Sequence, residues 1–324
     1  MKRILVAIAC LALASPAWAE KPRRVPVQNS PLAPVVTTIS GSPLTIAIGD
    51  DTSMQVTNTN VPGTGQFYPP DCAPGQTADS GVFASVGATV YGPDFNNHPC
   101  GSASNSYTPW TPVSLSAVTG TGTSGDPFTV VVVADAAAAQ LRVTETITYV
   151  NGNPGAAISL QFSNAPPPGV SSPGGGATFN AFLAGDLFLA DSDSGFGAQV
   201  GTQYGGRGAS ACAPLNYTIL LGGTTPPTNW SATGYGTVWD EVSAAGLNDA
   251  VDSSICQDNG AAIEWAGLNV GGTPVVIGTG VSFSGTATPV GAAVPALSGK
   301  ALAALVLLLA GVGNVLAKRT SLGA

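Results

Sequence analysis

Glu145 is the residue whose type and setting most suggest catalysis. It lies in LRVTETITYV on the face whose other side chains are apolar, because successive strand residues point to opposite sides, and a lone carboxylate there is costly to bury. Glycosidases use two carboxyl groups across the scissile bond, and the chain offers Asp240, Glu241 and Glu264 as partners. A pairing with Arg207 and a place in a sugar-facing groove are the alternatives. The spacing brings no second carboxylate to Glu145, so we expect no catalytic residues.

The chain has one histidine, His98, which stands in the turn-rich stretch NNHPC. A Ser-His-Asp triad would have to be built around this residue, and no Gly-x-Ser-x-Gly elbow occurs. A site with several histidine ligands is excluded. We therefore expect His98 to lie in a surface loop.

The segment Asp191-Ser-Asp193-Ser-Gly195 is similar to the start of a calcium loop, in which alternating carboxylates converge on one hard cation. Its third ligand position is Gly195, and no bidentate Glu follows at the required spacing. Asp50-Asp51 is a weaker version of the same pattern. We expect ordinary turns at both places, and no metal or other cofactor.

Aromatic residues gather in NWSATGYGTVW, which contains Trp230, Tyr235 and Trp239 between Gly and Thr linkers. This composition suits a loop or edge that stacks on a flat carbohydrate ring. Packing in the core is the alternative for these residues, and also for Trp110 and Trp265. The three residues of the segment are our candidates for ligand stacking.

Four cysteines remain once the expected signal peptide, which contains Cys10, is removed: Cys72, Cys100, Cys212 and Cys256. An even number in an exported protein indicates disulfides. Three connectivities are possible, and pairing of neighbours along the chain is the simplest. A zinc site is disfavoured because there is no CxxC motif and only one histidine.

The composition and the alternation of apolar and polar residues predict that these residues belong to an all-β domain. Charged residues make up only 9% of the chain and its net charge is −8, so it lacks the basic patch that nucleic acid requires. Short alternating runs separated by Gly, Pro, Asn and Asp are typical of an antiparallel β-sandwich. The expected strands are 44–48, 54–57, 81–90, 128–133, 141–150, 156–162, 187–190, 217–221, 262–268 and 280–286.

We expect one large sandwich over residues 35–290, with no helix before residue 301. Residues 141–150 and 156–162 are separated by the turn sequence NGNPG, which predicts a hairpin. The Pro- and Gly-rich stretch 164–176 is interpreted as a long surface loop. A boundary between two domains is the alternative.

The N-terminus has the features of a secretory signal peptide over residues 1–19. Two basic residues precede a short apolar run, and Ala-Trp-Ala precedes a cleavage site between Ala19 and Glu20. A membrane helix and a lipoprotein signal at Cys10 are the alternatives. Residues 20–34 are rich in Pro and basic side chains, which predicts a flexible leader.

The C-terminus has an uncharged apolar run at 301–317, followed by a basic end at 318–324. This predicts a transmembrane helix with a cytoplasmic end; a core helix is the alternative. Val294, Pro295, Leu297 and Ser298 resemble the signature of IPTL-CTERM sorting tails, although Gly-Lys stands where that family usually has Glu-Trp. The resemblance implies envelope or surface localisation, the membrane as a partner, and a sorting or processing enzyme.

The body also resembles uncharacterised bacterial surface β-sandwich domains in GQFYPP, VYGPDF and TGTGTSGDPF. We therefore expect an exported, envelope-associated structural or adhesive protein that is not an enzyme and has a glycan or another surface molecule as its partner. The alternatives are a carbohydrate-binding module that uses the aromatic segment and a carbohydrate-active enzyme that uses Glu145.

Overall fold

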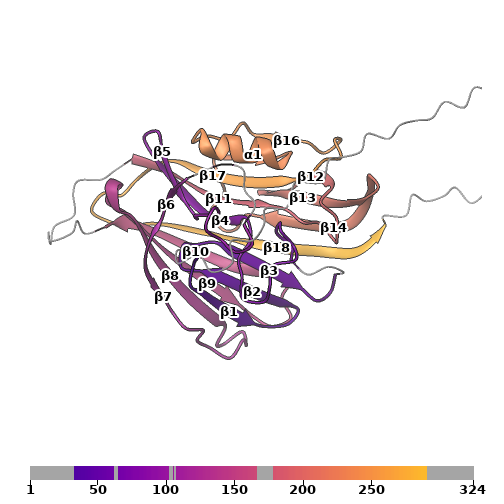
Figure 1. Ribbon diagram of the computed structural model, residues 1–324, viewed down its shortest axis with the longest axis horizontal. Coiled ribbons are helices and arrows are strands. Elements are labelled where there is room, and N and C mark those ends of the chain that lie inside the picture. The colour runs from indigo at the N-terminus through magenta and orange to yellow at the C-terminus, as the bar shows by residue number, and fades with distance from the viewer. Residues whose placement is uncertain (1–32, 62–64, 102–104, 106, 166–177, 290–324) are drawn as a thin grey trace, which may run out of the picture.

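The computed structural model describes residues 33–61, 65–101, 105, 107–165 and 178–289. The expected signal peptide (1–19), sorting signature (294–298), membrane helix (301–317) and basic end (318–324) lie outside the described residues, as does nearly all of the leader (20–34). The described part consists mainly of β-strands in three sheets (Figure 1).

The largest sheet has eight strands: β7 (Thr111–Leu115), β8 (Phe128–Ala136), β9 (Leu141–Tyr149), β10 (Gly155–Asn164), β12 (Gly195–Val200), β13 (Gln203–Ser210), β14 (Ala213–Leu221) and β18 (Val275–Pro289). Their order is β12-β13-β14-β18-β10-β9-β8-β7, with every pair antiparallel. The predicted hairpin is confirmed, because Ile147 of β9 lies opposite Ile158 of β10.

The second sheet has seven strands: β4 (Ser80–Val86), β5 (Thr89–Gly92), β6 (Thr108–Pro109), β11 (Thr178–Asp186), β15 (Asn229–Ala232), β16 (Ala250–Val251) and β17 (Gly260–Asn269). Their order is β16-β15-β17-β11-β4-β5-β6, and only the short pairs β15–β16 and β5–β6 are parallel. Strands before and after residues 166–177 therefore contribute to both large sheets.

A three-stranded sheet of β1 (Val36–Ser40), β2 (Leu44–Gly49) and β3 (Met54–Asn58) contacts β8 and β4, so it touches both large sheets. The helix α1 (Tyr235–Ser243) packs on β17 and β11, on the side of the seven-stranded sheet away from the eight-stranded one (Figure 1). A 3-10 turn, η1 (Ala137–Ala139), joins β8 to β9.

Two clusters of buried apolar side chains hold these layers together. The main core draws on all three sheets and includes Ile46, Ile147 and Ile263. The smaller cluster lies between α1 and the seven-stranded sheet and contains Trp239 and Phe182. Successive residues of β17 and of β11 therefore alternate between the two cores, as the pleat of a strand requires.

Several element predictions are wrong. The expected strand 81–90 is two strands, β4 and β5, that turn at Gly87, whose φ is +59°. Residues 187–190 form no strand: the strand in this region is β11, which was not predicted and ends at Asp186, and Leu187 makes an isolated bridge with Phe67. The helix α1 was missed because β-branched and Gly residues interrupt its helical pattern, yet it buries Val238, Trp239 and Val242.

The prediction of a membrane partner through a C-terminal helix is corrected. Among the described residues, no helix is long and apolar enough to cross a membrane. The α-helix α1 has nine residues, and at about 1.5 Å per residue it is less than half as long as the roughly 30 Å thickness of a bilayer core.

Candidate functional site

Glu145 lies where its sequence pattern placed it, on the inner face of β9, with 1% of its surface exposed. Its neighbours across the strands are Val132 on β8 and Leu160 on β10. Its Oε2 has no hydrogen-bond partner among the described residues. Burial, together with the nearby charge of Asp51, raises the pKa of Glu145 to about 8, so the carboxyl is mainly protonated at neutral pH.

The three carboxylates proposed as catalytic partners of Glu145 lie on the other side of the seven-stranded sheet. Asp240 and Glu241 belong to α1, and Glu264 on β17 accepts a hydrogen bond from the backbone N of Leu247 at 3.1 Å. Leu247 belongs to the cluster under α1, whereas Glu145 faces the main core. A sheet therefore separates them, and they cannot flank one glycosidic bond with Glu145.

The alternative partner of Glu145, Arg207, lies on β13. Its guanidinium carbon is 5.5 Å from the centre of the Phe196 ring, in a cation–π arrangement. The structure therefore gives Arg207 an aromatic partner on the neighbouring strand rather than the buried carboxyl.

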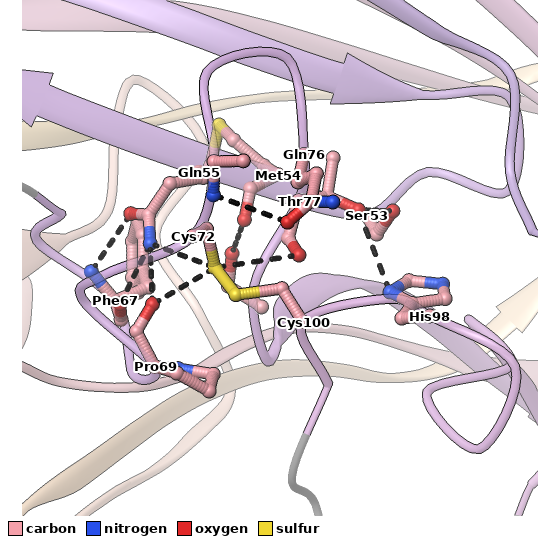
Figure 2. The surroundings of a disulfide bond; sticks show 12 residues. Ser53, Met54, Gln55, Phe67, Pro69, Cys72, Gln76, Thr77, His98 and Cys100 are labelled. Atoms are coloured by element: carbon pink, nitrogen blue, oxygen red, sulfur yellow. Dashed lines mark hydrogen bonds between the residues drawn. A yellow bond between two sulfur atoms is a disulfide. The ribbon is translucent and has the colours of Figure 1, made fainter. Parts of the chain in front are cut away.

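His98 is buried, with 3% of its surface exposed, so the prediction of a surface loop is wrong. Its Nε2 is 2.6 Å from Oδ2 of Asp51, and its Nδ1 is 3.4 Å from the hydroxyl of Thr77. Figure 2 shows that His98 lies beside the disulfide that joins Cys72 and Cys100. Sequence reasoning missed the pair because 47 residues separate its members.

Asp51 and His98 form a buried ion pair. Burial alone would raise the pKa of Asp51, but the charge and hydrogen bond of His98 lower it below its ordinary value. Burial alone would lower the pKa of His98, and Asp51 raises it instead. Ser53 donates its hydroxyl proton to Asp51 rather than to His98, so this network lacks the order of a Ser-His-Asp triad.

The aromatic candidates have different environments. Trp239 is wholly buried under α1 against Phe83 and Phe95, so its assignment as a ligand-stacking residue is wrong. Tyr235 begins α1 and is half-buried. Trp110 and Trp265 are core residues, as the alternative expected.

Trp230 is half-buried on β15 and lies flat on Tyr204 of β13, with ring centres 4.4 Å apart and planes 8° from parallel. Tyr204 is buried beneath it. Asp249 accepts a hydrogen bond from the backbone N of Trp230 at 3.1 Å, and Gln199 donates one to the hydroxyl of Tyr204 at 3.3 Å. The stack therefore joins the two large sheets and has polar groups at its rim.

The four cysteines form two disulfides, Cys72–Cys100 and Cys212–Cys256, which confirms the pairing of chain neighbours. Disulfides are typical of proteins in an oxidising compartment. The bonds also use all four thiols that a zinc site would need.

The acidic segment 191–195 contributes one residue to a cluster of three carboxylates. Asp191 is exposed, but Asp193 lies close to Asp186 and Asp258, and each of these three carboxylates offers an oxygen within 4.8 Å of the others. The sequence pattern showed only Asp193, because the other two come from β11 and from the loop before β17.

No family model matches the chain, and no curated protein matches it in sequence. Among solved structures, a bacterial glucoamylase complexed with acarbose aligns at 11% identity and a TM-score of 0.46, over 83% of this chain and 34% of that one. A putative kojibiose phosphorylase from the human microbiome aligns at 8% identity and a TM-score of 0.35, over 78% and 33%. A putative aldose 1-epimerase from Escherichia coli K12 aligns at 9% identity and a TM-score of 0.39, over 77% of this chain and 99% of that one.

The chain thus spans about a third of the length of the glucoamylase and of the phosphorylase. All three structures carry the names of enzymes, so the prediction that this chain is not an enzyme is corrected and no longer held. Similarity at this level assigns no activity and no site residue to the chain.

Proposed function

We propose that the protein is an exported carbohydrate-binding protein and that Trp230, supported by Tyr204, is its sugar-stacking residue. The parallel stack of these two rings carries the proposal. The proposed site retains Trp230 from the aromatic segment of the sequence, and Tyr204 from the opposite sheet takes the place of the buried Trp239.

The geometry suits a pyranose ring. Tyr204 is buried and covers one face of the indole, and Trp230 is half-buried, so part of the indole reaches solvent. The support holds the indole in one orientation, which lowers the entropy lost on binding. The apolar face of a sugar stacks on an aromatic ring, and polar groups at the rim orient its hydroxyls.

Polar groups are available beside the stack. Asp249 is exposed, and its two carboxylate oxygens already hold the backbone N of Trp230 and the side chain of Asn229. Gln199 is exposed next to Tyr204. A carboxylate oxygen accepts more than one hydrogen bond, so Asp249 is the residue we expect to contact a sugar hydroxyl.

A glycan array followed by titration calorimetry tests the proposal. We expect binding that is lost in Trp230→Ala and retained in Trp230→Phe, which keeps an aromatic face. Trp239→Phe is the matched control, because it changes a buried tryptophan of the same segment and should leave binding unchanged. Absence of binding across a broad array, or equal binding by wild type and a folded Trp230→Ala variant, would refute the proposal.

A further inference from the structure

Three carboxylates from separate parts of the chain meet at one edge of the sandwich. Asp186 is the last residue of β11, Asp193 lies in the turn before β12, and Asp258 lies in the loop before β17. Each offers an oxygen within 4.8 Å of the other two. Asp186 has 1% of its surface exposed, and the other two are half-buried. Three like charges this close repel one another unless a cation or protons compensate them.

A fourth oxygen at this place supplies independent evidence for a ligand. Asn259 is wholly buried. Its side-chain nitrogen donates a hydrogen bond to the carbonyl of Thr233 at 3.4 Å, which identifies the other atom as Oδ1. That Oδ1 receives no hydrogen bond from the described residues. Buried amide oxygens nearly always have a donor or a cation as a partner.

The position of Asn259 ties this oxygen to the carboxylates. Its backbone carbonyl accepts a hydrogen bond at 2.9 Å from Leu187, the residue after Asp186. Its Oδ1 is 3.0 Å from the place that a Cβ on Gly195 would occupy, and Gly195 follows Asp193 by two residues. In the chain, Asn259 directly follows the third carboxylate. The amide oxygen therefore lies where the three acidic segments join.

We propose that Asp186, Asp193, Asp258 and the side-chain oxygen of Asn259 bind a divalent cation, and that the cation is calcium. All four donors are oxygens, which hard cations prefer to the nitrogen and sulfur ligands of zinc. Calcium takes 6–8 oxygen ligands in irregular geometry, and the half-buried Asp193 and Asp258 leave a side open to water. Magnesium requires nearly ideal octahedral geometry, which ligands from a strand end, a turn and a loop do not favour.

The cation would fasten the edge of the sandwich. Gly195 at the start of β12 exchanges two backbone hydrogen bonds with Gln257, at 2.8 and 2.9 Å, so a strand of the eight-stranded sheet is bonded there to the loop that leads into the seven-stranded sheet. The same loop contains Cys256 of the second disulfide. Calcium and the disulfide thus hold one loop at two points.

Isothermal titration of the chelator-treated protein with Ca²⁺ alone tests the site. We expect one bound ion, with a Kd on the order of 10⁻⁴ to 10⁻³ M, as in extracellular calcium modules, and a rise in melting temperature on adding Ca²⁺. Asp193→Asn and Asp258→Asn keep the side-chain volume and should each weaken binding about tenfold or more, because ligand charge sets the affinity. Asp240→Asn, an exposed carboxylate on α1, is the control and should bind as wild type.

Each result of this titration either supports or overturns the calcium site. Circular dichroism without the ion shows that the variants fold, so a loss of binding in folded Asp193→Asn or Asp258→Asn supports the site. Absence of heat and of a melting shift at about 10 mM Ca²⁺, ten times the weakest expected Kd, overturns it. Equal binding by wild type and both variants also overturns it, and tighter binding of Mg²⁺ than of Ca²⁺ overturns the choice of ion.

Discussion

Replacing Glu145 with Gln should make the protein more stable at alkaline pH, because the wild-type carboxyl is buried without a charge partner. Burial raises its pKa from 4.5 to about 8. Below pH 4.5 the carboxyl is protonated in both the folded and the unfolded chain. As the pH rises from there, the unfolded chain releases the proton first, so stability is lost until the folded carboxyl also ionises near pH 8.

The expected magnitude follows from the difference between the two pKa values. One pKa unit corresponds to about 1.4 kcal/mol, so the rise from 4.5 to about 8 costs the wild-type protein about 5 kcal/mol of unfolding free energy between acid and alkaline pH. Gln has the same shape and does not titrate in this range. The free energy of unfolding of Glu145→Gln minus that of wild type should therefore increase by about that amount from pH 4 to pH 9.

Urea denaturation at several pH values, followed by tryptophan fluorescence with the disulfides intact, measures this difference. Taking the difference between two proteins cancels the titration of the groups that do not interact with Glu145. Asp126→Asn, at an exposed turn, is the control and should leave the pH profile unchanged. A difference between Glu145→Gln and wild type that does not vary with pH would show that Glu145 ionises normally, and would refute the reasoning.

Two further predictions concern stability. His98→Ala should lower the free energy of unfolding by about 3–5 kcal/mol, because it leaves the buried carboxylate of Asp51 without its cation; urea denaturation measures this, and a double variant with Asp51→Ala should recover part of the loss. Replacing Cys212 and Cys256 together with Ala should cost about 4 kcal/mol, from the loop entropy of a 44-residue separation. An unchanged denaturation midpoint would contradict either prediction.

Local patterns located the strands with clear alternation, such as β8, β9 and β10, but missed β11. The alternation in β9 and the turn after it predict a hairpin, because the two-residue period and the turn chemistry act between near neighbours. The same reasoning identified Glu145 as a carboxylate on a buried face. Its protonation follows from burial, which the structure supplied.

Glycine-rich strands could not be recognised in this way. β12 and β13 contain GFGAQV and QYGGRGAS, which look like turns in sequence. A Cβ on Gly197 would lie 2.1 Å from the carbonyl oxygen of Ala232 in the other sheet, and one on Gly205 would lie 1.9 Å from that of Ile219. Glycine is therefore required by close contact with another backbone, from the other sheet at Gly197 and from the neighbouring strand β14 at Gly205.

In each candidate site, the sequence identified one residue and the tertiary structure supplied its partners. The composition of the aromatic segment identified Trp230, but the tertiary structure buried Trp239 and supplied Tyr204 from the opposite sheet. The carboxylate pattern identified Asp193 without the partners that make a cation site. Spacing along the chain cannot predict such partners, because each belongs to a different strand or loop.

The sequence by itself determined the all-β class, the main hairpin, the apolar face that carries Glu145 and the even number of cysteines available for disulfides. These features depend on composition and on interactions between residues near in the chain. Only the tertiary structure decided which cysteines pair, which aromatic rings reach solvent and which carboxylates converge. Those outcomes depend on how two large sheets stack and meet at their edge, where residues far apart in sequence become neighbours.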